Sequence, residues 1–130
     1  MLTQQTSDDL PQDALEPVCT AADVLEVTEE AKAVYVEESV NRYVVAVLRH
    51  TRADSRLYLG ASPRAGIALL RVAKARALAA GRSFVSPDDV KAVAEPVLAH
   101  RLIAAPESRS AGLAAEDLVR DAIEKTPVPV

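Results

Sequence analysis

The chain has few of the residues that would support a covalent framework or an aromatic core. Cys19 is the single cysteine among 130 residues, so no disulfide can form within the chain, as suits a reducing compartment. Tryptophan is absent, and aromatic residues make up only 3%. Hydrophobic residues nevertheless reach 49%, so the core must consist of Ala, Val, Leu and Ile. This composition suits close-packed helices better than a β-sandwich.

Long apolar runs are also missing. No stretch approaches the roughly 18 residues needed to span a bilayer. The N-terminus lacks the basic start and apolar stretch of a secretory signal. We therefore expect a cytoplasmic protein that makes no membrane contact. The length fits one domain with tails.

The usual motifs of an enzyme are absent too. The four glycines form neither a G-x-x-x-x-G-K-[ST] loop nor a G-x-G-x-x-G loop, so the chain has no phosphate-binding loop of its own. His50 and His100 are far apart in the sequence, and with one cysteine they make no zinc-ligand set. Asp88 and Asp89 resemble paired catalytic carboxylates, but a helix-capping role explains them better. The chain by itself is predicted not to be an enzyme.

Charge is strongly segregated along the sequence. Residues 1–38 hold ten acids and one base, and residues 110–130 hold four acids and two bases. Residues 39–109 instead hold twelve bases and five acids. This basic middle indicates an anionic partner such as nucleic acid, nucleotide phosphates or an acidic protein face, the alternative being a solvated Arg/Lys surface.

The pattern of apolar and capping residues predicts an all-α fold: a small bundle of five or six helices with no significant sheet. In residues 37–52, apolar side chains recur at helical spacing. We expect a connector or flexible arm over residues 1–19, a helical domain over 20–125 and a C-terminal tail over 126–130. The helices are expected at about residues 21–33, 37–52, 63–80, 86–93 and 114–125, with a short turn at 97–102, extended links at 34–36 and 84–85, and loops at 53–61 and 104–112.

Residues 60–66, Gly-Ala-Ser-Pro-Arg-Ala-Gly, form the most informative segment. Ser62 is a good N-cap, and Pro63 suits the first position of a helix, where no amide partner is lost. Arg64 then lies in the first helical turn, where the positive end of the helix dipole opposes a cation by about 0.3–1 kcal/mol. An anion would reverse the sign of that effect. Free amides and a guanidinium together predict a phosphate clamp at this helix start.

Several segments together resemble the C-terminal lid domain of MoxR-type AAA+ ATPases, over about residues 16–130. The specific one is residues 59–65, Leu-Gly-Ala-Ser-Pro-Arg-Ala. Residues 84–90, Phe-Val-Ser-Pro-Asp-Asp-Val, are less specific, because histone-fold and other AAA+ lid helices start similarly. The supporting segments are residues 15–18, 21–25, 43–52, 97–102, 115–117 and 128–129.

The resemblance implies that Arg64 is the sensor 2 arginine. In this family that arginine reaches from the lid to the γ-phosphate of ATP bound in the neighbouring core domain. Ser62 and Pro63 would face the nucleotide with it. The guanidinium would stabilise charge on the phosphoryl group during hydrolysis, which uses Mg in the parent protein, and would help to close the lid.

The same resemblance implies that the catalytic segments of the family lie outside this chain. Walker A, Walker B, sensor 1 and the arginine finger belong to the core domain, so we expect a fragment or truncated product of a bacterial ATPase. The expected partners are its own core domain, neighbouring subunits of a ring (usually a hexamer) and a client with a von Willebrand A domain, remodelled in a chaperone-like way. The fragment itself is expected neither to hydrolyse ATP nor to bind it tightly.

Two other functions fit parts of the pattern. Helix 63–80 carries Arg64, Arg71, Lys74 and Arg76 and no acid, as in a helical nucleic-acid-binding module. Its many alanines and the scarcity of Asn and Gln in the basic region argue against that function. A long central helix before the helix start at residues 86–89 is also typical of a histone-fold-like dimerisation domain.

Overall fold

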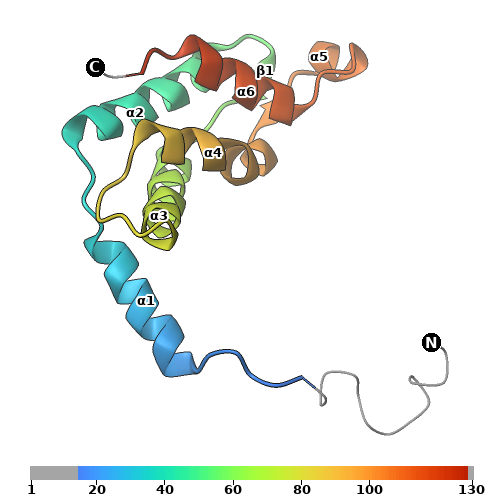
Figure 1. Cartoon of the computed structure of the whole chain (residues 1–130). Coiled ribbons are helices and arrows are strands. Elements are labelled where there is room, and N and C mark those ends of the chain that lie inside the picture. Colours follow the sequence, from blue (N-terminus) through green and yellow to red (C-terminus); the bar gives the residue numbers. More distant parts are fainter. Residues whose placement is uncertain (1–14, 129–130) are drawn as a thin grey trace, which may run out of the picture.

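The computed structural model describes residues 15–128 (Figure 1). Residues 1–14 of the expected connector therefore lie outside the described residues. The described part is mostly helical, with six α-helices and a two-stranded sheet, which confirms the predicted fold class. In chain order the elements are α1 (Ala21–Ala33), α2 (Glu38–Ala53), β1 (Leu57–Leu59), α3 (Pro63–Ala79), α4 (Pro87–Leu98), the 3₁₀ turn η3 (Ala99–Arg101), β2 (Ile103–Ala104), α5 (Pro106–Ser110) and α6 (Ala115–Lys125).

The core lies between α2, α3, α4 and α6. The apolar face predicted for α2 is buried throughout, including Val47, which is completely inaccessible. Helix α3 faces the core with small residues, and Gly66 lets it approach α2 so closely that a Cβ there would lie 2.6 Å from Leu48 Cδ1. The small residues of α3 thus allow close contact with α2. The buried residues of α3 are Ala65, Gly66, Leu69, Ala73 and Ala77.

Side chains cap the starts of α1 and α4. Thr20 and Asp23 form a capping box at the start of α1, and Ser86 and Asp89 form another at the start of α4. Asp89 is 2% exposed and also accepts two hydrogen bonds from the guanidinium of Arg82, at 2.6 and 2.7 Å. The capping role is therefore confirmed for Asp89, and it leaves no free pair of carboxylates at this helix start.

The expected end of the fourth helix was wrong. Helix α4 continues through Pro96 to Leu98 instead of stopping near residue 93. An internal proline costs about 3 kcal/mol, because it removes one backbone hydrogen bond and crowds the preceding turn. Continuing the helix buries Val97 and Leu98, and burial of each such side chain is worth about 1.5–3 kcal/mol. The free energy gained by burying Val97 and Leu98 therefore exceeds the cost of the internal proline.

Two expected loops contain regular structure. Strand β1 lies within residues 53–61, and helix α5 lies within residues 104–112. Strand β1 pairs with β2 antiparallel, with Leu57 opposite Ala104. The pairing joins segments that are far apart in the sequence, so no local sequence pattern predicts it. The two predicted extended links are confirmed, because Tyr35 and Phe84 form a parallel β-bridge that ties them together.

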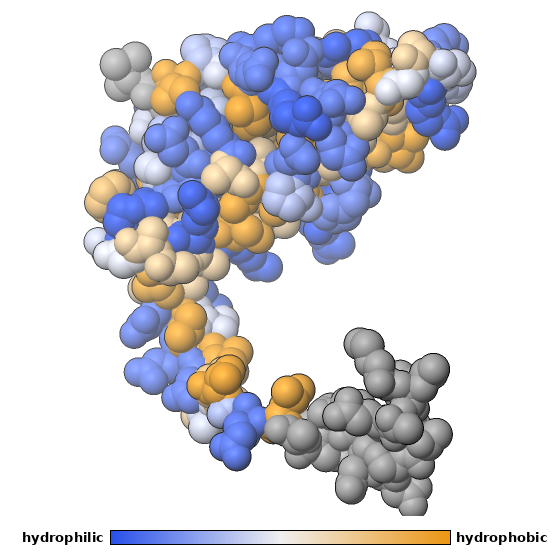
Figure 2. Space-filling view, turned by 45° about the vertical axis from the view of Figure 1, so that its right-hand side comes forward, coloured by the Kyte–Doolittle hydropathy of each residue, from blue (hydrophilic) through white to orange (hydrophobic). Residues whose placement is uncertain are grey.

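Helix α1 is an exception to the compact packing. It has no buried residue, and it runs away from the rest of the molecule (Figure 1). Its C-terminal end is held by α3, where the Lys74 ammonium donates a hydrogen bond to the Lys32 carbonyl at 2.8 Å. Orange hydrophobic side chains are visible along the projecting part of the helix (Figure 2).

Candidate functional site

The start of α3 has the local structure that its sequence predicts. Ser62 is the N-cap, with extended backbone, and its Oγ accepts a hydrogen bond from the Ala65 amide at 3.3 Å. Pro63 occupies the first helical position. Ser62, Pro63 and Arg64 are all exposed, so they form a consecutive surface at the end of the helix. Ser62 accepts hydrogen bonds from the Ala65 and Gly66 amides, so among the amides of this first turn the Arg64 amide is the one with no hydrogen bond to a described residue.

A contact that the sequence analysis missed holds this loop against α2. Thr51 is 1% exposed; its Oγ1 donates to the Leu48 carbonyl at 2.8 Å and accepts from the Ala61 amide at 3.0 Å. Gly60 makes the approach possible, since a Cβ there would lie 2.7 Å from both the Arg52 Cα and the Thr51 carbonyl oxygen. The glycine before Ala61 was the available signal for so close an approach, but nothing local identified Thr51 as the partner.

Four arginines on α2 and α3 form no ion pair with a described residue. The guanidinium of Arg64 is exposed and forms no ion pair or hydrogen bond with any other described residue. Arg71 lies seven residues further along α3, hence on the same face of the helix. Arg49 and Arg52 on α2 are likewise exposed, with no carboxylate partner in the described part of the chain. Cations without neutralising partners make the surface around them attractive to anions.

A shallow apolar groove runs between α2 and α3 beside the arginines. Its volume is about 270 Å³. That is below the roughly 300–1,000 Å³ of sites that bury a drug-sized ligand. The groove is therefore better suited to receiving side chains or one flat group than to enclosing a whole small molecule. Its lining residues are Asn41, Val44, Val45, Leu48, Arg49, Arg52, Ala61, Pro63, Gly66, Ile67 and Leu70.

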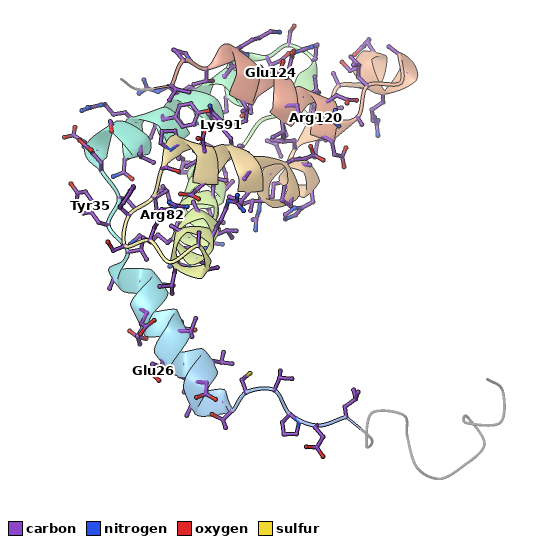
Figure 3. The ribbon with its side chains drawn as sticks, in the orientation of Figure 1. Glu26, Tyr35, Arg82, Lys91, Arg120 and Glu124 are labelled. Atoms are coloured by element: carbon purple, nitrogen blue, oxygen red, sulfur yellow. The ribbon has the colours of Figure 1, made fainter. Side chains whose placement is uncertain are left out.

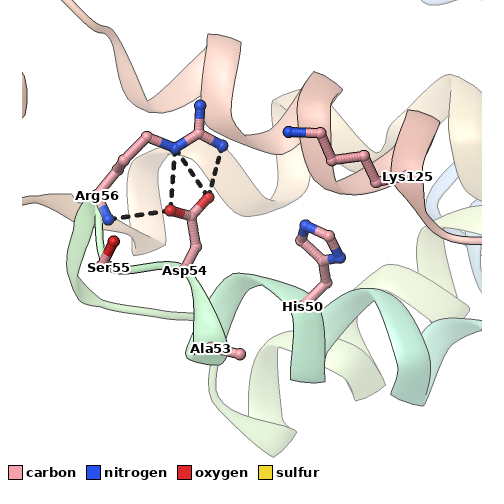
Figure 4. Close-up of a pocket in the computed structure, with 6 residues that line it drawn as sticks. All are labelled: His50, Ala53, Asp54, Ser55, Arg56 and Lys125. Carbon is pink, nitrogen blue, oxygen red and sulfur yellow. Dashed lines mark hydrogen bonds and ion pairs between the residues drawn. The ribbon is translucent and has the colours of Figure 1, made fainter.

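A second hollow, of about 440 Å³, lies between the end of α2 and α6 (Figure 4). It is lined by His50 and by charges that already have partners. Arg56 makes ion pairs with Asp54 and Asp121, and Lys125 pairs with Asp121 at 2.7 Å. Lys125 and then Arg56 lower the pKa of Asp121 to about 2. Because each cation is neutralised, this cluster links α2 to α6 and offers little to a ligand.

Other classes of site find no support in the described residues. No group of three or more His, Cys, Asp or Glu side chains among residues 15–128 could hold a metal ion. No helix there is long and apolar enough to cross a membrane. The buried face of α3 packs against α2 and α4 of the same chain.

Comparison with known proteins places the loop before α3, and α3 itself, within a recognised domain. Residues 49–122 match the family described as the AAA lid domain. The uncharacterised protein YeaC of Bacillus subtilis is 37% identical over 120 residues, covering 92% of this chain and 38% of that protein. Chaperone MoxR1 of Mycobacterium tuberculosis is 29% identical over 121 residues, covering 86% of this chain and 32% of that protein.

A solved structure agrees. The crystal structure of a "putative ATPase" from Cytophaga hutchinsonii superposes with a TM-score of 0.78 at 32% sequence identity. The match covers 84% of this chain and 36% of that one. The chain thus spans about a third of the length of the proteins it resembles.

Proposed function

The chain belongs to the AAA lid domain family and is similar to MoxR-type AAA+ ATPases, and on this premise we propose that it closes over ATP bound by a core domain outside the chain. The lid would cover the adenine side of the nucleotide, with Ser62 and Pro63 against it. The exposure of Ser62, Pro63 and Arg64 at the start of α3 supports this assignment, because these consecutive residues are open to a nucleotide held mainly by other residues.

Arg64 is proposed as the sensor 2 arginine, and one observation carries this proposal. Its guanidinium is exposed, lies in the first turn of α3 and has no carboxylate partner within residues 15–128, although salt bridges occupy many other cations of the chain. A cation at the positive end of a helix is unfavourable unless an anion approaches. The γ-phosphate of Mg-ATP would be such an anion, and charge that develops during hydrolysis would strengthen the interaction.

The hydrogen bonds behind Arg64 support a transmitting role. Thr51 and Gly60 hold the loop before α3 tightly against α2, so a force on Arg64 reaches the body of the domain. A lid pulled by the nucleotide could therefore move as a unit against the core. We extend the proposal to ATP-driven, chaperone-like remodelling within a ring, usually a hexamer, in the cytoplasm, with neighbouring subunits as partners and a von Willebrand A domain as client.

The test uses the full-length ATPase that contains this lid. Arg64→Ala should lower the steady-state rate of ATP hydrolysis by about 10²–10³ while changing nucleotide affinity much less, because the core still holds the other phosphates. Arg64→Lys should restore only part of the rate, since an ammonium lacks the planar fork of a guanidinium. Arg71→Ala is the matched control, being an exposed, unpaired arginine on the same helix face. Equal effects of Arg64→Ala and Arg71→Ala would show that Arg64 has no special role.

Nucleic-acid binding remains the second candidate, favoured by the four unpaired arginines. In that case Arg49, Arg52, Arg64 and Arg71 would each contact phosphates, and removal of any one would weaken binding by a similar factor. A salt-dependent mobility shift of duplex DNA at micromolar concentrations of this chain would support it. We expect no such shift, because the groove beside the arginines is apolar.

A further inference from the structure

Helix α1 presents an apolar and acidic surface with nothing packed on it. Val24, Leu25 and Val27 are 55%, 68% and 55% exposed. Val24 and Val27 are three residues apart and so project from neighbouring positions on one side of the helix. Adjacent apolar side chains left in water on a projecting helix are typical of an interaction surface.

The charge on α1 is almost entirely negative. The helix carries four acids and one base, and that base, Lys32, is paired with Glu29 at 2.6 Å. Glu26 and Glu30 have no ion pair within the described part of the chain. Figure 3 shows Glu26 projecting from the side of α1. A surface complementary to α1 must therefore combine apolar contacts with positive charge.

The groove between α2 and α3 has that combination. Val45 and Ile67, which line it, are 45% and 54% exposed, although Val44 beneath them is buried. Arg49 and Arg52 line the same groove and have no carboxylate partner within residues 15–128. The groove thus presents apolar side chains beside two free cations, whereas α1 presents apolar side chains beside free carboxylates.

Helix α1 cannot reach the groove of its own chain. Its C-terminal end is attached at Lys74, in the second half of α3, whereas the groove uses Pro63, Gly66, Ile67 and Leu70 of the first half. From that attachment α1 runs away from the helical body (Figure 1). Only another molecule can bring the two surfaces together.

We propose that α1 of one copy of this chain docks into the α2–α3 groove of a second copy. Val24 and Val27 would contact Val45 and Ile67, and the acids of α1 would face Arg49 and Arg52. This is recognition of an amphipathic helix by a groove. Because the two surfaces differ, the contact is head-to-tail, so each copy keeps a free helix and a free groove for further copies. The contact needs neither nucleotide nor a core domain, and Arg64 does not line the groove.

The association should be weak and sensitive to salt. One 13-residue helix buries less than the roughly 1,200–2,000 Å² of a standard stable interface, so we expect a dissociation constant of about 10–500 μM. Raising the ionic strength from about 0.05 to 0.5 M shortens the screening length and should weaken binding several-fold.

The experiment is sedimentation velocity on the whole 130-residue chain, between about 10 μM and 1 mM, a range chosen to bracket the expected constant. The average mass should rise with concentration through dimers to longer species. Val24→Glu/Val27→Glu removes the helix surface, and Val45→Glu/Ile67→Glu removes the groove; each should leave a monomer. All four positions are at least 45% exposed, so the fold should persist, as far-UV circular dichroism would verify. Tyr58→Glu, 79% exposed on β1, is the matched control and should associate like the parent chain.

Mixing the two monomeric variants gives the sharpest outcome. One keeps an intact helix and the other an intact groove, so a head-to-tail contact predicts a 1:1 dimer that grows no further. Three results would overturn the proposal: a parent chain that stays monomeric at about 1 mM, association that survives either double variant, or folded variants that fail to form the mixed dimer. Any of these would leave α1 or the groove to a partner of another kind without affecting the test of Arg64.

Discussion

Asp89 is the residue whose replacement should most clearly disrupt this fold. Its carboxylate is 2% exposed and accepts hydrogen bonds from the Ser86 amide and hydroxyl, both at 2.8 Å, and from two nitrogens of Arg82. Asp89→Asn keeps the size of the side chain but removes the charge and one acceptor oxygen. The bidentate pair with Arg82 is then lost, and the capping box is weakened.

The expected loss of stability follows from these contacts. Breaking a buried ion pair typically costs about 3–5 kcal/mol, because the remaining partner loses its compensation. The Arg82 side chain is 31% exposed and can be partly rehydrated, so the loss should lie at or below the lower end of that range. We expect Asp89→Asn to lower the free energy of unfolding by about 2–3 kcal/mol, equivalent to a fall of about 8–15 °C in Tm for a domain near 100 residues.

Urea unfolding followed by circular dichroism at 222 nm measures this loss. Asp88→Asn is the matched control, because Asp88 is the adjacent acid on the same helix, its side chain is 88% exposed and its ion pair with Lys91 is long, at 3.4 Å. An exposed pair of that kind contributes about 0–1 kcal/mol. If the two variants lose the same free energy of unfolding, the buried hydrogen bonds of Asp89 do not stabilise the fold by the expected amount.

The pH dependence of stability gives a second test of the hydrogen bonds and ion pair around Asp89. Hydrogen bonds from Arg82, and then from Ser86, hold the pKa of Asp89 well below its usual value of 3.8. A carboxyl group whose pKa is lower in the folded state stabilises the fold above the unfolded pKa, and the contribution is lost as pH falls. The parent chain should therefore lose stability as pH falls below about 5, and Asp89→Asn should lose less over the same range. Parallel curves for both proteins would contradict the argument.

Three other substitutions test the packing around α2. Tyr43→Phe should leave stability unchanged or raise it by up to about 1 kcal/mol, because the buried Tyr43 hydroxyl has no hydrogen-bond partner among the described residues; a thermal melt suffices, and a clear loss would reveal an unseen partner. Thr51→Val should cost about 1–3 kcal/mol, since it leaves the buried Ala61 amide unsatisfied, and chemical denaturation with Thr28→Val, an exposed threonine in α1, as control would measure it. Gly60→Ala should be destabilised to a similar degree, about 1–3 kcal/mol, because its Cβ would meet the backbone of α2; full stability would mean that the loop can shift freely.

The sequence by itself determined the elements whose signals are local. The apolar period of α2, the capping boxes of α1 and α4, and the Ser-Pro start of α3 each depend on residues within a turn or two of one another. Contacts so close in the chain are specified by a few neighbouring residues, so the sequence predicts them wherever tertiary packing does not oppose them. The candidate site belongs to this class, because Ser62, Pro63 and Arg64 are consecutive and their arrangement follows from the helix start alone.

Only the tertiary structure decided the features that depend on distant partners. Helix α4 passes Pro96 because the core receives Val97 and Leu98, and β1 forms because β2 lies beside it. The groove beside Pro63 and the exposure of α1 follow from how α2, α3 and α1 pack, which their separate periodicities do not specify. Thr51 supports the loop before α3 because Gly60 allows that loop to lie against the end of α2. Burial free energies of a few kcal/mol per side chain are comparable to local preferences, so long-range packing can overrule a local signal wherever the two conflict.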